Sequence, residues 1–136
     1  MKLSENFTLE ELICSATADR RKIHNVPDST HIYNLSRLCS TLLQPVRNKF
    51  GAPIKVTSGF RCEALNKIVG GASTSQHLRG EAADIVCQDN RKLWHTILGM
   101  IESGEVVVGQ LIDEKNLRWI HISLPTSKHQ NQVLKL

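Results

Sequence analysis

The sequence predicts an α+β domain in which a small antiparallel sheet packs against helices. Two observations predict this class. Helical periodicity dominates the first half of the 136-residue chain, and short strand-like segments gather in the second half. The length suits one domain, 1–136, with a single hydrophobic core. We expect the core to span residues 5–124 and the polar tail, 125–136, to lie at the periphery.

The first half contains most of the predicted helices. Thr8 followed by Glu11 forms a capping-box pattern at the start of the short helical segment LEELI. The stretch 15–30, SATADRRKIHNVPDST, is expected to be mostly loop. A long amphipathic helix is predicted from Ser29 onward, because its apolar residues recur at the helical period, and Pro45 should kink or interrupt it.

Most of the predicted strands lie in the second half. Four segments of the chain are short and either apolar or alternating; they are 53–58 and, in the second half, 82–87, 106–112 and 117–124. The last two are separated by the turn-like sequence DEKN and predict a hairpin. Helices are predicted over 63–69, ended by the pair Gly70 and Gly71, and from a cap at Asp89 or Asn90 to Gly104.

Composition argues against several classes of function. The 17 basic and 13 acidic residues give a net charge of +4, but the basic residues are scattered and aromatic residues make up only 4%, so nucleic acid is not an expected partner. No apolar run approaches the roughly 20 residues of a membrane span. The N-terminal stretch MKLSENFTLEEL lacks the apolar centre of a signal peptide, so we expect a cytoplasmic protein as synthesised. A monomer is the default expectation for its oligomeric state.

The spacing of the four cysteines excludes a zinc ribbon or knuckle. Cys14, Cys39, Cys62 and Cys87 form no C-x-x-C pair. Because no secretory signal is evident, we expect reduced thiols that are mostly buried and act as small hydrophobic side chains.

Residues suited to metal chemistry gather in the segment 58–84. His77 and Asp84 form a His-x6-Asp pair, and the alanines before Asp84 are too small to crowd a metal ion. His121, in the alternating segment RWIHIS, is the best candidate for a third ligand. Two imidazoles and one carboxylate would leave the fourth position of a zinc ion for water, as in catalytic zinc sites. Alternatively, Asp84 forms a salt bridge to Arg79 or Arg61.

These residues resemble the M15 family of zinc peptidases. The resemblance rests on S-x-H-x6-D from Ser75 to Asp84, on an arginine sixteen positions before His77, and on W-x-H ending at His121; it extends to about Leu124. The small phage and prophage members, related to D-Ala-D-Ala carboxypeptidases and endolysin peptidases, are the most similar. The resemblance implies one zinc ion on His77, Asp84 and His121, the fold shared by DD-peptidases and the hedgehog signalling domain, and bacterial peptidoglycan as substrate.

The resemblance and the side-chain chemistry also indicate groups that act on substrate. The planar guanidinium of Arg61 could bind a substrate carboxylate or stabilise an oxyanion; otherwise it forms a structural ion pair with Glu63 or Glu81. Ser75 and Gln76 are candidates for substrate binding or for support of the ligands, although the polarity of the loop alone would explain them.

The proton-transfer residue departs from the pattern of the better-known family members. Those members carry a catalytic carboxylate three residues before the last histidine, where this chain has Arg118. The small phage-type members carry a glutamate after a Q-L-I strand, which assigns the role here to Glu114, with Asp113 as the alternative. Both acids could instead be exposed turn residues. The family strand usually begins with an aspartate where this chain has Gly109.

The expected function is that of a zinc-dependent peptidase that hydrolyses an amide bond in peptidoglycan stem peptides, as a carboxypeptidase or an endopeptidase. Such a protein would act on the cell wall after phage-mediated release. Two alternatives stay open. A catalytically inactive, zinc-containing module could bind the cell wall or a protein, because no acid stands at position 118. The chain could also be a metal-free domain.

Overall fold

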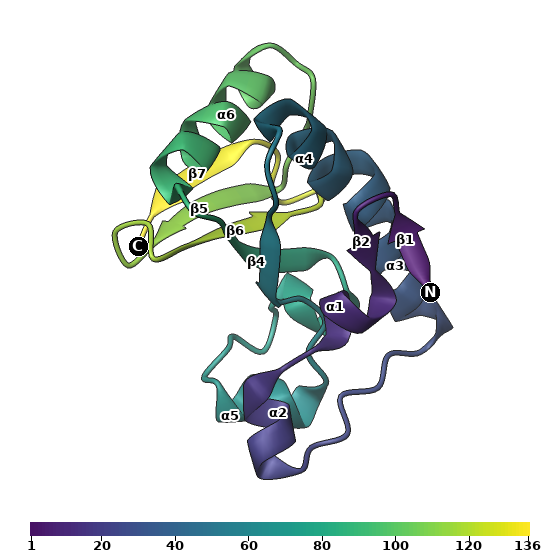
Figure 1. Cartoon of the computed structure of the whole chain (residues 1–136). Helices are drawn as coiled ribbons and strands as arrows, with labels where there is room; N and C mark the ends of the chain where they lie inside the picture. The colour runs from purple at the N-terminus through teal and green to yellow at the C-terminus, as the bar shows by residue number, and fades with distance from the viewer.

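The strand-like segments form one five-stranded sheet. The computed structural model describes all residues, 1–136 (Figure 1). The strands are β3 (Lys55–Ser58), β4 (Ala82–Val86), β5 (Gln110–Glu114), β6 (Trp119–Ser123) and β7 (Gln132–Lys135). Their order is β3-β4-β6-β5-β7. The first three pairings are antiparallel, but β5 and β7 run parallel. The sheet is therefore mixed, whereas the sequence predicted an antiparallel one.

The helices precede or separate these strands. They are α1 (Leu9–Ile13), α2 (Ala16–Arg21), α3 (Ser29–Leu38), α4 (Gln44–Phe50), α5 (Glu63–Ile68) and α6 (Asn90–Glu102). In Figure 1, α4 and α6 lie at one end of the molecule, and α2 and α5 lie at the other. None of the helices combines the length and the apolar composition needed to cross a lipid bilayer.

The long helix predicted from Ser29 is present but interrupted. After α3 the chain forms a π-helical turn, η1 (Cys39–Leu43), and then continues as α4. Pro45 follows this turn, and its ring nitrogen has no hydrogen to donate to a carbonyl of the preceding turn. The widened turn is one of the usual ways in which a helix accommodates such a break, so the predicted interruption at Pro45 is confirmed.

The N-terminal region is more regular than predicted. The Thr8 hydroxyl accepts a hydrogen bond from the Glu11 amide at 3.2 Å, which confirms the predicted cap of α1. The stretch expected to be loop contains α2, capped by the Ser15 hydroxyl at 3.1 Å from the Ala18 amide. Two short strands, β1 (Lys2–Ser4) and β2 (Phe7–Thr8), pair antiparallel. Elements this short lack the repeated apolar pattern from which helices and strands are predicted.

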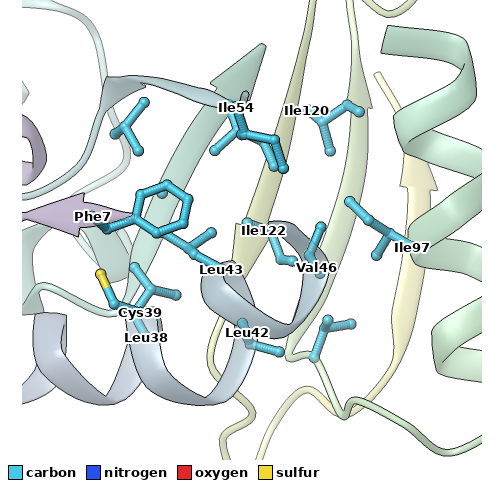
Figure 2. Close-up of a cluster of buried hydrophobic side chains, with 14 of the residues drawn as sticks. Phe7, Leu38, Cys39, Leu42, Leu43, Val46, Ile54, Ile97, Ile120 and Ile122 are labelled. Atoms are coloured by element: carbon cyan, nitrogen blue, oxygen red, sulfur yellow. The ribbon is translucent and has the colours of Figure 1, made fainter. Parts of the chain in front are cut away.

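The hydrophobic core lies between the helices and one face of the sheet. Ile120 and Ile122 of β6 point to this face and are fully buried. Figure 2 shows them near Ile97 of α6 and Val46 of α4. Because side chains alternate along a strand, the residue between the two isoleucines, His121, points to the opposite face.

Residues 125–136, which were expected to lie at the periphery, add β7 to the edge of the sheet. Beyond the ladder with β5, the Gln132 amide donates to the Gly109 carbonyl at 3.0 Å, and the Leu136 amide donates to the Asp113 carbonyl at 2.8 Å. Every second residue of β7 is exposed. Backbone pairing therefore holds this strand more than apolar burial does.

Deletion of residues 131–136 should lower the free energy of unfolding by about 3 kcal/mol, because several backbone hydrogen bonds worth about 1 kcal/mol each are lost. Denaturant unfolding followed by circular dichroism measures the change. Val133→Thr is the matched control, since Val133 is 42% exposed and threonine suits a strand equally well. An unchanged unfolding midpoint after the deletion would contradict the role assigned to β7.

The thiols are free, as expected, but only Cys39 is buried; Cys14 is exposed and the other two are partly buried. Burial, with a smaller contribution from the charge of Glu11, raises the pKa of Cys39 to about 12.

The thiolate is the reactive form of cysteine, so a thiol reagent at pH 8 should modify Cys14 first and Cys39 only after unfolding. Ellman's assay on the wild type and on Cys14→Ser tests this order. Rapid native labelling of Cys39 would contradict it.

Candidate metal centre

The register between β4 and β6 brings two of the predicted ligands together. Asp84 lies directly opposite His121 in this antiparallel pair. Side chains opposite each other project from Cβ atoms about 4.5–5.5 Å apart on the same face of a sheet. The neighbours Ala83 and Ile122 point to the core and are fully buried. Asp84 and His121 therefore share the face that the core leaves free.

The third candidate ligand, His77, comes from a 3-10 turn, η2 (Gln76–Arg79). Its Nδ1 lies 2.7 Å from the carbonyl oxygen of Gly59. A carbonyl only accepts hydrogen bonds, so Nδ1 carries the hydrogen and Nε2 presents a lone pair. This Nε2 lies 3.3 Å from Asp84 Oδ1. The Arg61 amide also donates to the His77 carbonyl at 3.1 Å, which fixes the turn against the segment before α5.

The three side chains fit one metal ion. One ligand atom each from His77, Asp84 and His121 lies within 4.8 Å of the other two. His121 Nδ1 is 3.1 Å from Asp84 Oδ1, and His77 Nε2 is 3.3 Å from the same oxygen. Ligand atoms bound tetrahedrally at about 2.0–2.1 Å from zinc lie about 3.3 Å apart. Both distances agree with that spacing, and two nitrogens with one oxygen form a common zinc ligand set.

The charges of the centre suit metal binding. Burial alone would raise the pKa of the Asp84 carboxyl, but hydrogen bonds and charge from His121 and His77 hold it well below its usual range. Burial lowers the pKa of His77, against the opposing effect of Asp84. Asp84 is thus ionised and His77 is favoured in its neutral form, and these are the protonation states in which both groups bind metal ions.

Arg61 is fixed within the same cluster. Its NH2 group lies 3.3 Å from Asp84 Oδ2, on the far side of the carboxylate from the histidines. Its Nε donates to the Ser58 hydroxyl at 3.0 Å, and its NH1 donates to Asn66 Oδ1 at 3.1 Å. Asp84 therefore forms the salt bridge to Arg61 that was the alternative prediction, and it also lies beside the two histidines.

Neither of the acids proposed as structural partners of Arg61 binds it. Its one ion pair is with Asp84, and Glu81 is paired with Arg79 at 2.7 Å instead. Burial lowers the pKa of Arg61, while the charges of Asp84 and Glu114 act in the opposite direction. The guanidinium of arginine is not deprotonated in proteins, so Arg61 remains charged.

The cluster lies in a cleft of about 910 Å³. One wall is the loop from Val69 to Gln76, and the other includes residues 126–129. This volume is within the range of about 300–1,000 Å³ that is usual for ligand sites. Three cations, Arg61, Arg79 and Lys128, and two acids, Asp84 and Glu114, line the cleft.

The two acids at the end of β5 face opposite ways. Glu114 lines the cleft, as do Gln110 and Ile112 on the same face of the strand. It pairs with Trp119, two residues before His121, and so lies diagonally across from that histidine. The alternative acid, Asp113, is buried outside the cleft, and its Oδ1 accepts a hydrogen bond from the Leu117 amide at 2.6 Å.

Ser75 and Gln76 line the cleft but also have structural partners. The Ser75 hydroxyl accepts a hydrogen bond from the His77 amide at 3.2 Å and caps η2. Gln76 is 9% exposed, and its Nε2 donates to the Leu124 carbonyl at 2.9 Å. Both side chains therefore hold the turn that carries His77.

The glycine that precedes β5, Gly109, has a steric cause. A Cβ atom at Gly109 would lie 2.3 Å from the Leu124 carbonyl oxygen and 3.0 Å from Ser123 Oγ. The end of β6 thus approaches the backbone too closely for the aspartate that the family strand usually carries here. The Ser123 hydroxyl instead accepts a hydrogen bond from the Gln110 amide at 2.9 Å.

Sequence reasoning missed two residues that line the cleft and one that binds Arg61. Lys128 and His129 were assigned to a peripheral tail, and Asn66, which contacts Arg61 but does not line the cleft, was predicted only as part of a short helix. Asn66 lies four residues before the pair Gly70 and Gly71, and no local pattern indicates its contact with Arg61. Lys128 and His129 reach the cleft because the chain returns to the sheet edge as β7, and no local pattern indicates that return.

Comparisons with known proteins agree with this geometry. A segment of 44 residues is 50% identical to the zinc D-Ala-D-Ala carboxypeptidase of Streptomyces albus G; it covers 32% of this chain and 17% of that protein. The chain thus spans well under two thirds of this relative. The model of the Peptidase M15 family matches residues 5–123. Together with the three-residue cluster, this match confirms the predicted cofactor, one zinc ion. Because it extends over most of the 136 residues, the chain belongs to the peptidase M15 family.

Proposed function

We propose that the chain is a zinc-dependent peptidase that hydrolyses an amide bond in the stem peptides of bacterial peptidoglycan. The observation that carries this proposal is the convergence of His77, Asp84 and His121 at a cleft that also holds a free acid, Glu114, and a fixed cation, Arg61. In the proposal the two histidines and the aspartate are the zinc ligands. The name of the Streptomyces relative supports a cell-wall peptide as the substrate class.

The zinc ion would supply Lewis acidity, which generates a hydroxide-like nucleophile from water near pH 7 and polarises the amide carbonyl. The chain contributes the orientation of the ligands. The hydrogen bond from His77 Nδ1 to the Gly59 carbonyl keeps Nε2 directed at the cluster. Asp84 offers one oxygen to the histidines and the other to Arg61, so its carboxylate is held on both sides.

Glu114 is proposed as the proton-transfer residue. It would take a proton from the attacking water and deliver it to the nitrogen of the leaving amine. Its position on the cleft face of β5, diagonally across from His121, supports this role. Asp113 is less suited, because its carboxylate accepts a hydrogen bond in the β5–β6 turn and does not line the cleft.

Arg61 is proposed to bind the substrate. Its side chain is 14% exposed and lines the cleft, and its guanidinium keeps N–H groups that no protein atom uses. It would bind a substrate carboxylate or stabilise the oxyanion that forms from the scissile carbonyl. The cations around the cleft favour a peptide that carries carboxylates. Ser75 and Gln76 are proposed to contact the same peptide from the loop wall.

The remaining features of the proposal concern the architecture. One chain supplies every proposed ligand and catalytic group, so the site needs no second copy, and we propose a monomer. We also propose that the single domain follows the arrangement shared by DD-peptidases and the hedgehog signalling domain, with the zinc site on the sheet face opposite the core. Its action on the cell wall would follow phage-mediated release.

Replacement of His121 by alanine should reduce zinc affinity by more than about 100-fold, because loss of a ligand costs more than the 10- to 100-fold effect of changes around a ligand. Zinc content after dialysis, and the rise in melting temperature on zinc addition, measure this loss. His95→Ala is the matched control, since His95 is exposed on α6. A wild-type chain that acquires no stoichiometric zinc would overturn the metal assignment.

Glu114→Gln should lower kcat by about 100- to 10,000-fold with zinc retained, because the amide cannot carry the proton. The matched control, Asp113→Asn, should keep kcat near the wild-type value, since its amide oxygen can still accept the hydrogen bond from Leu117. Digests of purified peptidoglycan and of D-Ala-D-Ala peptides, analysed by mass spectrometry, give both the rate and the bond that is cut. A wild type that binds zinc and cell wall but releases no product would instead favour a binding module.

A further inference from the structure

We propose that Asn66 is a positioning residue that holds the guanidinium of Arg61 in the cleft and couples it to the glycine loop, defined here as residues 70–72. The inference rests on the proposed function for its effect on catalysis. The position of the guanidinium itself can be measured without any reaction. No pattern in the sequence assigns Asn66 a role.

Arg61 depends on Asn66 for one of its three fixed contacts. The other two acceptors, Ser58 and Asp84, stand opposite each other on β3 and β4 and hold Nε and NH2. Asn66, on α5, is the one acceptor of NH1. A guanidinium has five N–H groups, so two remain for a substrate. Asn66 supplies the third of the contacts that define their direction.

Asn66 is suited to this task because its side chain is buried and both its oxygen and its nitrogen have partners. It is 3% exposed. Its Oδ1 accepts from Arg61, while its Nδ2 donates to the Ala72 carbonyl at 2.9 Å. Its backbone carbonyl also accepts from the Gly71 amide at 2.9 Å. One amide group therefore joins the substrate-binding cation to the loop that forms a wall of the cleft.

Gly71 gives the same contact a second, independent determinant. A Cβ atom at this position would lie 2.1 Å from Asn66 Oδ1 and 3.0 Å from Arg61 NH1. The first contact is too short for any Cβ atom, so the Asn66 amide would have to shift, and the second is tighter than most Cβ contacts. The glycine loop thus lies directly against the hydrogen bond between Asn66 and Arg61. Substitution of Gly71 would displace that bond while leaving every atom of Asn66 in the sequence.

A guanidinium that is held in place should raise the reaction rate, because it is a preorganised group. Donors already aimed at the position where negative charge develops need not reorganise during the reaction. If the Asn66 oxygen were removed, NH1 would lose its acceptor, and the guanidinium would be held by Ser58 and Asp84 alone and less firmly oriented. Small misplacements of such groups cost about 10- to 100-fold in rate. The expected loss in kcat/KM for Asn66→Ala is of that size.

The test combines kinetics with a signal from Arg61 that is independent of activity. Hindered rotation of a held guanidinium gives separate NH1 and NH2 resonances in ¹⁵N-resolved NMR spectra. We expect separate Arg61 resonances in the wild type, with or without zinc, and averaged ones in Asn66→Ala and Gly71→Ala. Asn66→Asp keeps an oxygen toward Arg61 and should preserve the separation. Gly99→Ala is the matched control, because a Cβ there meets nothing within 4 Å.

The outcomes separate this inference from the proposed function. Averaged Arg61 resonances together with a 10- to 100-fold lower kcat/KM and unchanged zinc content support it. Separate resonances in a folded Asn66→Ala or Gly71→Ala variant overturn it, whatever the activity. If the wild type cleaves no peptide, the proposed function fails while the NMR comparison still decides the role of Asn66. If Asn66→Ala does not fold, Gly71→Ala carries the same test.

Discussion

The register of β4 against β6 is the constraint on which the candidate site depends. Asp84 stands opposite His121, and β3 adds Ser58 opposite Asp84, so three strands place one row of polar side chains across the sheet. An irregularity between Val56 and Ser58 sets the position of that last residue. A slip by one residue would turn the whole row into the core. The apolar neighbours of these residues, packed against α4 and α6, therefore enforce the geometry of the metal centre.

The centre also stabilises a buried carboxylate, that of Asp84. Asp84 is only 8% exposed, and an unpaired charge at that depth would destabilise the fold. Its two oxygens are instead divided between the histidines and Arg61, and no buried side-chain polar atom of the protein lacks a partner. The same division serves chemistry. One oxygen is kept for a metal ion, and the other orients the cation that we propose binds the substrate.

The two faces of the sheet separate stability from function. One face is covered by helices and buries apolar side chains, as Figure 2 shows, and the other carries the cleft. Loops and the returning C-terminal segment build the walls of that cleft. Such segments place functional groups on a rigid scaffold without disturbing the core. Asn66 is part of this arrangement, because it hydrogen-bonds both to Ala72 in the loop wall and to Arg61. The other contacts of Arg61 are with Ser58 and Asp84 of the sheet.

The sequence by itself determined the α+β class, most of the helices and strands, and the identity of the three candidate ligands. These follow from local periodicity and from side-chain types at fixed spacing. The tertiary structure decided the parallel pairing of β7, the difference between Glu114 and Asp113, and the contact between Asn66 and Arg61. Each of these depends on which segments lie side by side and on the face of a strand from which a side chain projects. Both are decided by strand register and by the path of the chain, through contacts between residues far apart in the sequence.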